Sequence, residues 1–335
     1  MKPLLALLCA TATCATPFAQ AAGARVALGD VPEYAFRSTL IRGKGEARLS
    51  DFRGQPVLVQ FWNSKLWGAT DDMMKVVLRV QLEHEADLQV ILVEPRLQPA
   101  ALERLLLEKG WLGTRAVWTT ERPFDHGGSD PACVLLSCEG AVILKSPDLG
   151  QSYDRTYPNQ FMDELDAAVA AESDRRHGLL PDAPPAVSKA CDEFAEGKVA
   201  RALTSVRTLA GQDPTATHAL ATFERQIAAR LGQAEFFLGK GRIAEAEAIL
   251  DPLAGELSLA DDLARRLAGM REQLATATLK AEREADRALA KLEKTLFTDG
   301  STDRTPVALK ALAKRHEGTR RGAEAARLAA LLQED

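Results

Sequence analysis

Cysteine is scarce in this sequence and has no regular spacing. Five cysteines occur in 335 residues, and only Cys133, Cys138 and Cys191 lie beyond the first 20 positions. An odd number of cysteines without close pairs does not make a disulfide framework. Cys133 and Cys138 are expected on one strand, roughly 16 Å apart at the rise of an extended chain. That separation predicts that they do not form a disulfide with each other.

Long apolar runs, metal-ligand spacings and nucleotide-binding loops are also missing. Beyond the N-terminal segment no run approaches the length that a membrane-spanning helix needs, so we expect no integral membrane segment. The five histidines show no metal-ligand spacing with each other or with cysteine. G-x-S-x-G, Walker and H-E-x-x-H motifs do not occur, so we expect no metal and no cofactor. The net charge of −5 argues against nucleic acid as a partner.

The first 21 residues have the pattern of a cleavable export signal. Lys2 is followed by a short apolar run from Leu4 to Leu8, and Ala19-Gln20-Ala21 forms a small-x-small cleavage site. A membrane anchor is the alternative, but the run is short and is interrupted by threonine and proline. We therefore expect a periplasmic or secreted protein.

Residues 27–178 alternate between strand-like and helix-like patterns, which predicts an α/β domain. The expected strands are 57–62, 88–93 and 116–118, the expected helices are 66–85, 99–109 and 159–172, and a hairpin is expected at 133–137 and 141–145. Parallel pairing is expected among the early strands and a hairpin after them, and the helix at 159–172 is expected to close the domain. Three prolines mark residues 179–187 as a stiff linker.

Residues 188–335 are rich in alanine, leucine, glutamate and arginine, which predicts an all-α domain. The segment 197–202 is echoed at 241–246, and 209–211 is echoed at 253–255 with the same offset. This echo is similar to tetratricopeptide-like helical hairpins, in which a glycine-containing turn joins two helices. The strict tetratricopeptide pattern is not met, and an irregular bundle in which alanines repeat by chance is the alternative.

Three segments resemble a known family at the right spacings. Residues 49–64 read LSDFRGQPVLVQFWNS, residues 130–136 read DPACVLL, and residues 139–143 read EGAVI. Together they resemble TlpA-type thioredoxins and related redoxins. The resemblance implies a thioredoxin-like fold, with a central mixed sheet flanked by helices and with Pro131 in the cis form.

The sequence departs from this family where the chemistry takes place. Lys65 replaces the tryptophan before the active-site motif, and Leu66 and Ala69 replace its two cysteines. The family's reaction needs a thiolate at a helix N-terminus and a second thiol one turn later. Neither Leu66 nor Ala69 supplies one, so the sequence predicts no dithiol-disulfide exchange.

Other polar and thiol groups offer weaker candidates. Cys133, two residues after Pro131, is either a residual catalytic thiol or a small buried core residue. Cys138 and Cys191 are expected to be exposed, without an activating neighbour. The glycine-rich loop at 123–130 contains Asp125, His126 and Asp130, and it is either a ligand-binding loop or a solvated turn. Arg320 and Arg321 are expected on a solvated helix face.

Two functions therefore remain open. The first is a binding or scaffold protein of the cell envelope that holds a protein or peptide without exchanging disulfides. The second is a single-cysteine, thiol-dependent oxidoreductase or antioxidant that uses Cys133. In the first case the expected binding groove consists of Trp62, Lys65, Leu66, Trp67, Asp130 and Pro131.

Overall fold

The computed structural model describes residues 24–65, 69–84, 88–113, 115–146, 157–176, 182–254, 257, 259–276 and 279–333. The predicted export signal, Leu66 and Trp67 lie outside these residues. Among the described helices none is both long and apolar enough to cross a membrane.

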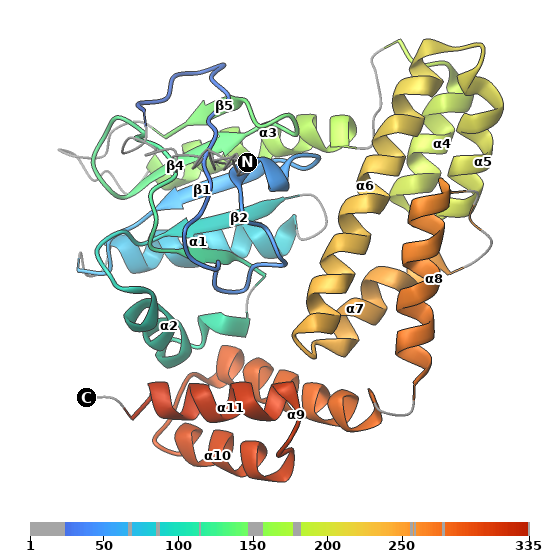
Figure 1. Ribbon diagram of the computed structural model, residues 1–335. Coiled ribbons are helices and arrows are strands. Elements are labelled where there is room, and N and C mark those ends of the chain that lie inside the picture. The colour runs from blue at the N-terminus through green and yellow to red at the C-terminus, as the bar shows by residue number, and fades with distance from the viewer. Residues whose placement is uncertain are drawn as a thin grey trace, which may run out of the picture.

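A five-stranded mixed sheet forms the centre of the first half (Figure 1). Its strands are β1 (Val57–Phe61), β2 (Gln89–Val93), β3 (Val117–Thr119), β4 (Ala132–Leu136) and β5 (Val142–Lys145), in the order β3-β2-β1-β4-β5. β1 pairs in parallel with β2, and β2 pairs in parallel with β3. β4 runs antiparallel to both β1 and β5. The expected parallel pairing and the final hairpin are confirmed.

The helices of this half cover one face of the sheet. They are α1 (Ala69–Glu83), α2 (Pro99–Glu108) and α3 (Tyr157–Arg176), with the short 3-10 turn η2 (Trp111–Gly113). A second 3-10 turn, η1 (Leu49–Phe52), packs on the other face. Leu58 and Leu135 face these helices, whereas Val57, Val59 and Phe61 face the other way, because side chains alternate along a strand. The second face is covered mainly by the segment before β1. The Asp130-Pro131 peptide bond is cis. This arrangement is the predicted thioredoxin-like fold, and we call residues 24–176 the sheet unit.

The next five helices share a separate hydrophobic core, and we call them the helical arm. They are α4 (Pro185–Ala195), α5 (Val199–Ala210), α6 (Pro214–Gly239), α7 (Ile243–Leu250) and α8 (Asp261–Ala275), with the 3-10 turn η3 (Asp251–Leu253) after α7. Gly197 and Gly241, which occupy equivalent positions in the sequence echo, both have positive φ values of 80° and 72°. Each starts the turn before a helix, so the echoed segments have the same local structure.

The last three helices, α9 (Leu279–Asp299), α10 (Thr305–Arg315) and α11 (Arg320–Leu331), form a base below the sheet unit (Figure 1). Their residues Leu289, Leu296 and Leu328 belong to the same hydrophobic core as the helix-covered face of the sheet. On the surface, the Arg327 guanidinium donates from Nη1 and Nη2 to the two oxygens of the Glu103 carboxylate on α2. The C-terminal half is thus all-α, as predicted, and its final third packs directly on the sheet unit.

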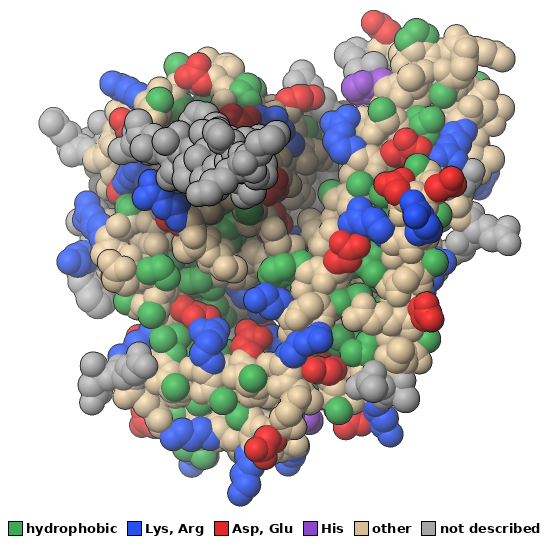
Figure 2. All heavy atoms as spheres, in the orientation of Figure 1, with side chains coloured by type: hydrophobic (Ala, Val, Ile, Leu, Met, Phe, Trp, Pro, Cys, Tyr) green, Lys and Arg blue, Asp and Glu red, His purple; other side chains and the backbone are tan. Residues whose placement is uncertain are grey.

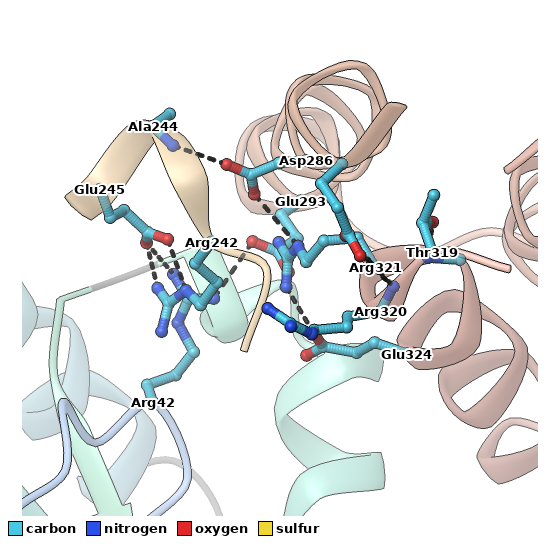
Figure 3. A network of polar contacts seen from close by, with 12 residues as sticks. Arg42, Arg242, Ala244, Glu245, Asp286, Glu293, Thr319, Arg320, Arg321 and Glu324 are labelled. Atoms are coloured by element: carbon cyan, nitrogen blue, oxygen red, sulfur yellow. Dashed lines mark hydrogen bonds and ion pairs between the residues drawn. The ribbon is translucent and has the colours of Figure 1, made fainter. Parts of the chain in front are cut away.

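A buried cluster of charges joins the base to the other two parts (Figure 3). The Arg321 side chain is 1% exposed, so the expectation of a solvated face is wrong for this residue. Its guanidinium lies 3.1 Å from the Asp286 carboxylate, 3.4 Å from Glu293 and 2.5 Å from Glu324. Buried charges are tolerated only when each is paired, so this cluster fixes the relative positions of α9 and α11.

Arg42 extends the cluster into the sheet unit. Its guanidinium lies 3.1 Å from Glu293 of α9 and 3.9 Å from Glu245 of α7. Glu245 is also bound by Arg242 at the start of α7. Burial raises the pKa of Asp286, although the Ala244 N–H donates a hydrogen bond to its carboxylate. One network of ion pairs therefore connects the sheet unit, the helical arm and the base.

Replacing the central cation should destabilise the whole protein. In the variant Arg321→Met, Asp286 and Glu293 keep their burial but lose a partner, and we expect a loss of about 3 kcal/mol in the free energy of unfolding at pH 7. Urea denaturation measures this change. The exposed Lys310→Met on α10 is the matched control and should shift stability by less than about 0.5 kcal/mol. Equal stability of the two variants would contradict a stabilising role for the cluster.

Candidate functional site

The loop after β1 is held by a buried carboxylate. Glu94, at the end of β2, is fully buried and accepts hydrogen bonds from the backbone N–H groups of Ser64 and Arg96. The Lys65 N–H donates to the Asn63 side-chain oxygen at 3.1 Å. The Lys65 side chain is exposed, and α1 begins at Ala69. No local pattern marks Glu94 as a partner of this loop, because it follows a different strand and lies 30 residues after Ser64.

A second polar cluster supports the residue before the cis proline. The Asp130 carboxylate accepts two hydrogen bonds from Arg122, at 3.0 and 2.7 Å, and lies 3.0 Å from His126 Nε2. The Gly128 N–H donates to His126 Nδ1, so Nε2 carries the proton and donates to Asp130. His126 is only 5% exposed and its ring contacts Phe61, so the solvated-turn interpretation is wrong for this residue.

The electrostatics of Asp130 follow from these contacts. Burial alone would raise the pKa of this carboxyl, but the hydrogen bond from His126 and the charge and hydrogen bonds of Arg122 outweigh it. The pKa of Asp130 is therefore held below its usual range. Asp125 does not join the cluster, because its carboxylate accepts the Gly127 N–H at 2.8 Å instead. Across the part of the chain that the structure describes, no group of three or more metal-ligating side chains is present.

Trp62 does not line a groove. It is 1% exposed and packs edge-on against Trp111 and Trp118, with ring centroids 5.9 and 6.2 Å away. Trp111 and Trp118 are themselves stacked. Trp62 thus belongs to an aromatic cluster in the core rather than to a peptide-binding surface. Of the predicted groove residues that the structure describes, Lys65, Asp130 and Pro131 remain near the surface or just below it.

All three cysteines that the structure describes are buried. Cys133, on β4, is 1% exposed, and its thiol donates to the side-chain oxygen of Gln60. Burial raises the pKa of Cys133, which keeps the thiol protonated. Cys191 is also 1% exposed, and burial raises its pKa to about 11. Cys138 is 6% exposed. The expectation that Cys138 and Cys191 are exposed is therefore wrong.

The site that results has a redoxin frame without a reactive thiol. Its described parts are the cis Pro131, the carboxylate of Asp130 held by Arg122 and His126, and the exposed Lys65 in the loop before α1. None of the described side chains here is a thiolate, and a protonated, buried thiol is a poor nucleophile.

The mixed sheet and the cis proline before β4 define a protein with a thioredoxin-like fold. No protein-family model matches the chain, and no curated protein is similar to it. Solved structures similar to it include a thioredoxin-like superfamily protein, at 14% identity and a TM-score of 0.34, covering 48% of this chain and 100% of that one. Another is a thiol:disulfide interchange protein from Bacteroides sp., at 19% identity and a TM-score of 0.31, covering 42% and 91% of the two chains. A third is the thioredoxin domain of a thiol-disulfide oxidoreductase from Bacteroides vulgatus, at 14% identity and a TM-score of 0.30, covering 42% and 99%.

The lowered pKa of Asp130 predicts how the stability of the protein depends on pH. Because this pKa is lowered on folding, the carboxylate stabilises the protein above its unfolded pKa, and that contribution is lost as the pH falls through the folded pKa. We expect Asp130→Asn to cost about 2 kcal/mol at pH 7, since Arg122 and His126 lose a charged acceptor.

Urea denaturation of the wild type and Asp130→Asn between pH 7 and pH 3 measures this cost. The difference between the two proteins should shrink as the pH is lowered. The exposed Asp303→Asn is the control and should differ little from the wild type at any pH. A cost for Asp130→Asn that is constant with pH would rule out the ion-paired state.

Proposed function

We propose that this protein is an exported thioredoxin-like protein that binds a protein or peptide partner and does not catalyse dithiol-disulfide exchange. The observation that carries this proposal is the placement of the cysteines. Leu66 and Ala69 occupy the two positions that need thiols, and Cys133, Cys138 and Cys191 are all buried. A frame of this kind retains the backbone that pairs with a peptide and lacks the groups that would react with it.

The proposed binding groove lies beside the cis proline. In β-strand addition, backbone hydrogen bonds supply affinity and neighbouring side chains supply specificity. The Asp130 carboxylate is turned inward to Arg122 and His126, which holds the backbone at Pro131 in place. Lys65, in the loop after β1, is exposed. We include Leu66 and Trp67 in the groove because they follow Lys65 directly in the sequence.

The alternative, a single-cysteine oxidoreductase that uses Cys133, has less support. A thiol that attacks a substrate must be ionised and reachable. Cys133 is 1% exposed, and burial raises its pKa. The Gln60 oxygen accepts a hydrogen bond from its thiol, which favours the protonated form. These features are typical of a core cysteine.

We further propose that the export signal directs the protein to the cell envelope and that the helical hairpins provide a second binding interface. Tetratricopeptide-like arrays bind partners on surfaces formed by stacked helix pairs. The glycine turns at Gly197 and Gly241 support a repeated unit of this kind.

The absence of dithiol chemistry is testable by insulin reduction. The wild-type protein should precipitate insulin in the presence of dithiothreitol no faster than dithiothreitol alone. The double variant Leu66→Cys/Ala69→Cys restores two thiols one helical turn apart and should accelerate precipitation. An accelerating wild type would refute the proposal. In parallel, Cys133 should react with a thiol reagent only after unfolding, and rapid reaction in the folded protein would support the single-cysteine enzyme instead.

Partner binding at the groove is testable by site-specific photo-crosslinking. A photoreactive amino acid placed at Lys65, which is exposed, should give crosslinks to envelope proteins or peptides in cells. The same amino acid at Lys310, exposed on α10, is the matched control. Crosslinks that are absent at position 65, or identical at both positions, would count against a binding groove beside Pro131.

A further inference from the structure

The long helix α6 separates its charges between two faces. Its acidic residues form ion pairs with neighbouring helices of the arm: Glu224 binds Arg207 of α5 at 2.8 Å, and the exposed Glu235 binds Arg266 of α8 at 3.0 Å. On its other side, residues spaced by three or four form one stripe along the helix. The stripe contains no acidic residue and consists of Thr222, Arg225, Gln226, Ala229, Arg230, Gln233, Phe236 and Lys240.

This stripe lines two recesses between the helical arm and the sheet unit. The smaller recess has a volume of about 140 Å³ and is closed on the other side by residues 51–55. The larger has a volume of about 740 Å³ and is bounded by residues 39–43, the start of α2, and α9 and α11 of the base. Gly45 touches the Phe236 ring on the same stripe, and a Cβ there would lie only 3.2 Å from the ring. The arm and the sheet unit thus lie against each other at Gly45 and Phe236. The recesses lie along the parts of the α6 stripe that the sheet unit does not cover.

The walls of the two recesses are predominantly basic, although the protein as a whole has a net charge of −5. In Figure 2, lysine and arginine side chains are visible where the sheet unit, the arm and the base meet. The acidic residues in the walls are Asp51, Glu103, Glu293 and Glu324, and the basic residues are Arg42, Arg53, Arg225, Arg230, Lys240, Arg242, Arg320 and Arg327.

The acidic groups in these walls already have partners. Asp51 accepts the backbone N–H groups of Ala47 and Arg48, and Glu103 is bound by Arg327. Glu293 and Glu324 are paired with Arg321.

Two of the basic residues are available to a ligand. Arg225 and Lys240 are exposed, and neither has a carboxylate partner among the residues that the structure describes. Lys240 lies over the Phe236 ring, at 5.7 Å from its centroid. The stripe is therefore left with positive charge that nothing in this part of the chain neutralises.

We infer that this stripe is an interaction surface for an acidic, extended segment of a partner protein. Arg225 and Lys240 are separated by about 22 Å along the helix axis, a length that about seven residues of extended chain cover. A small anion fills only one recess, whereas an acidic segment places carboxylates near both residues. This surface is distinct from the groove beside Pro131 and does not depend on the function proposed for that groove.

Fluorescence anisotropy with the full chain and a labelled peptide of ten glutamates tests the inference. At low salt the peptide should bind at least about tenfold more tightly than a peptide of ten glutamines, because charge complementarity supplies the attraction. The double variant Arg225→Gln/Lys240→Gln should weaken binding about tenfold. The matched double variant Lys294→Gln/Lys310→Gln removes the same charge from exposed helix positions of the base and should bind as the wild type does.

Three results would overturn the inference. One is equal affinity for the glutamate and glutamine peptides, and another is equal binding by the two double variants. The third is complete displacement of the peptide by inorganic phosphate at a constant ionic strength, which would indicate a small-anion site instead. If the two surfaces are separate, the substitutions on α6 leave crosslinking from position 65 unchanged. A negative result for peptide binding to α6 can therefore be told apart from a negative result for binding at the groove beside Pro131.

Discussion

The relative placement of the three parts depends on the buried guanidinium of Arg321 and the carboxylates around it. Removing a charge from water costs several kcal/mol, and the cost is recovered only if partners approach with good geometry. Glu293 is shared between Arg321 of the base and Arg42 of the sheet unit, and Arg42 also faces Glu245 of the helical arm. Moving any one part would leave another part's charge unpaired. The network therefore selects one arrangement of the parts, and the apolar contacts of the base with the sheet unit supply much of the cohesion.

This arrangement gives the thioredoxin-like unit a surface that an isolated domain lacks. Helices α9 and α11 extend the core on the α2 side of the sheet, and α6 stands opposite the segment before β1. The site at Pro131 is stabilised separately, by Arg122 and His126 around Asp130. The fold thus holds the backbone beside the cis proline in place and adds a charged surface along α6. The binding functions proposed above use these two features, and neither feature requires a thiol.

The elements formed by local patterns were predictable from the sequence. The apolar run at 57–62 and the glycine turn at 139–140 predicted β1 and the hairpin, because each depends on neighbouring residues. The cis form of Pro131 was implied by the family resemblance and not by a local pattern. The wrong predictions concern burial and long-range pairing. Arg321 and His126 belong to polar sequences typical of solvated segments, and their burial depends on Asp286 and Asp130. Trp62 was expected in a groove, but Trp111 and Trp118, far away in sequence, enclose it. No spacing rule identifies such partners.

The absence of cysteine at positions 66 and 69 does not affect how the chain folds. Loss of a thiol removes a reaction but leaves strand pairing, helix packing and the cis proline unchanged, since none of these involves sulfur. Arg122 and His126 hold the Asp130 carboxylate and thereby support the backbone at Pro131. The Glu94 carboxylate supports the loop at Ser64 by accepting its backbone N–H. A redox enzyme needs such supports to position its thiols, and a binding protein needs them to hold a peptide-pairing edge rigid, because rigidity reduces the entropy lost on binding. Under the binding function proposed above, these supports hold the peptide-pairing edge in place without any thiol.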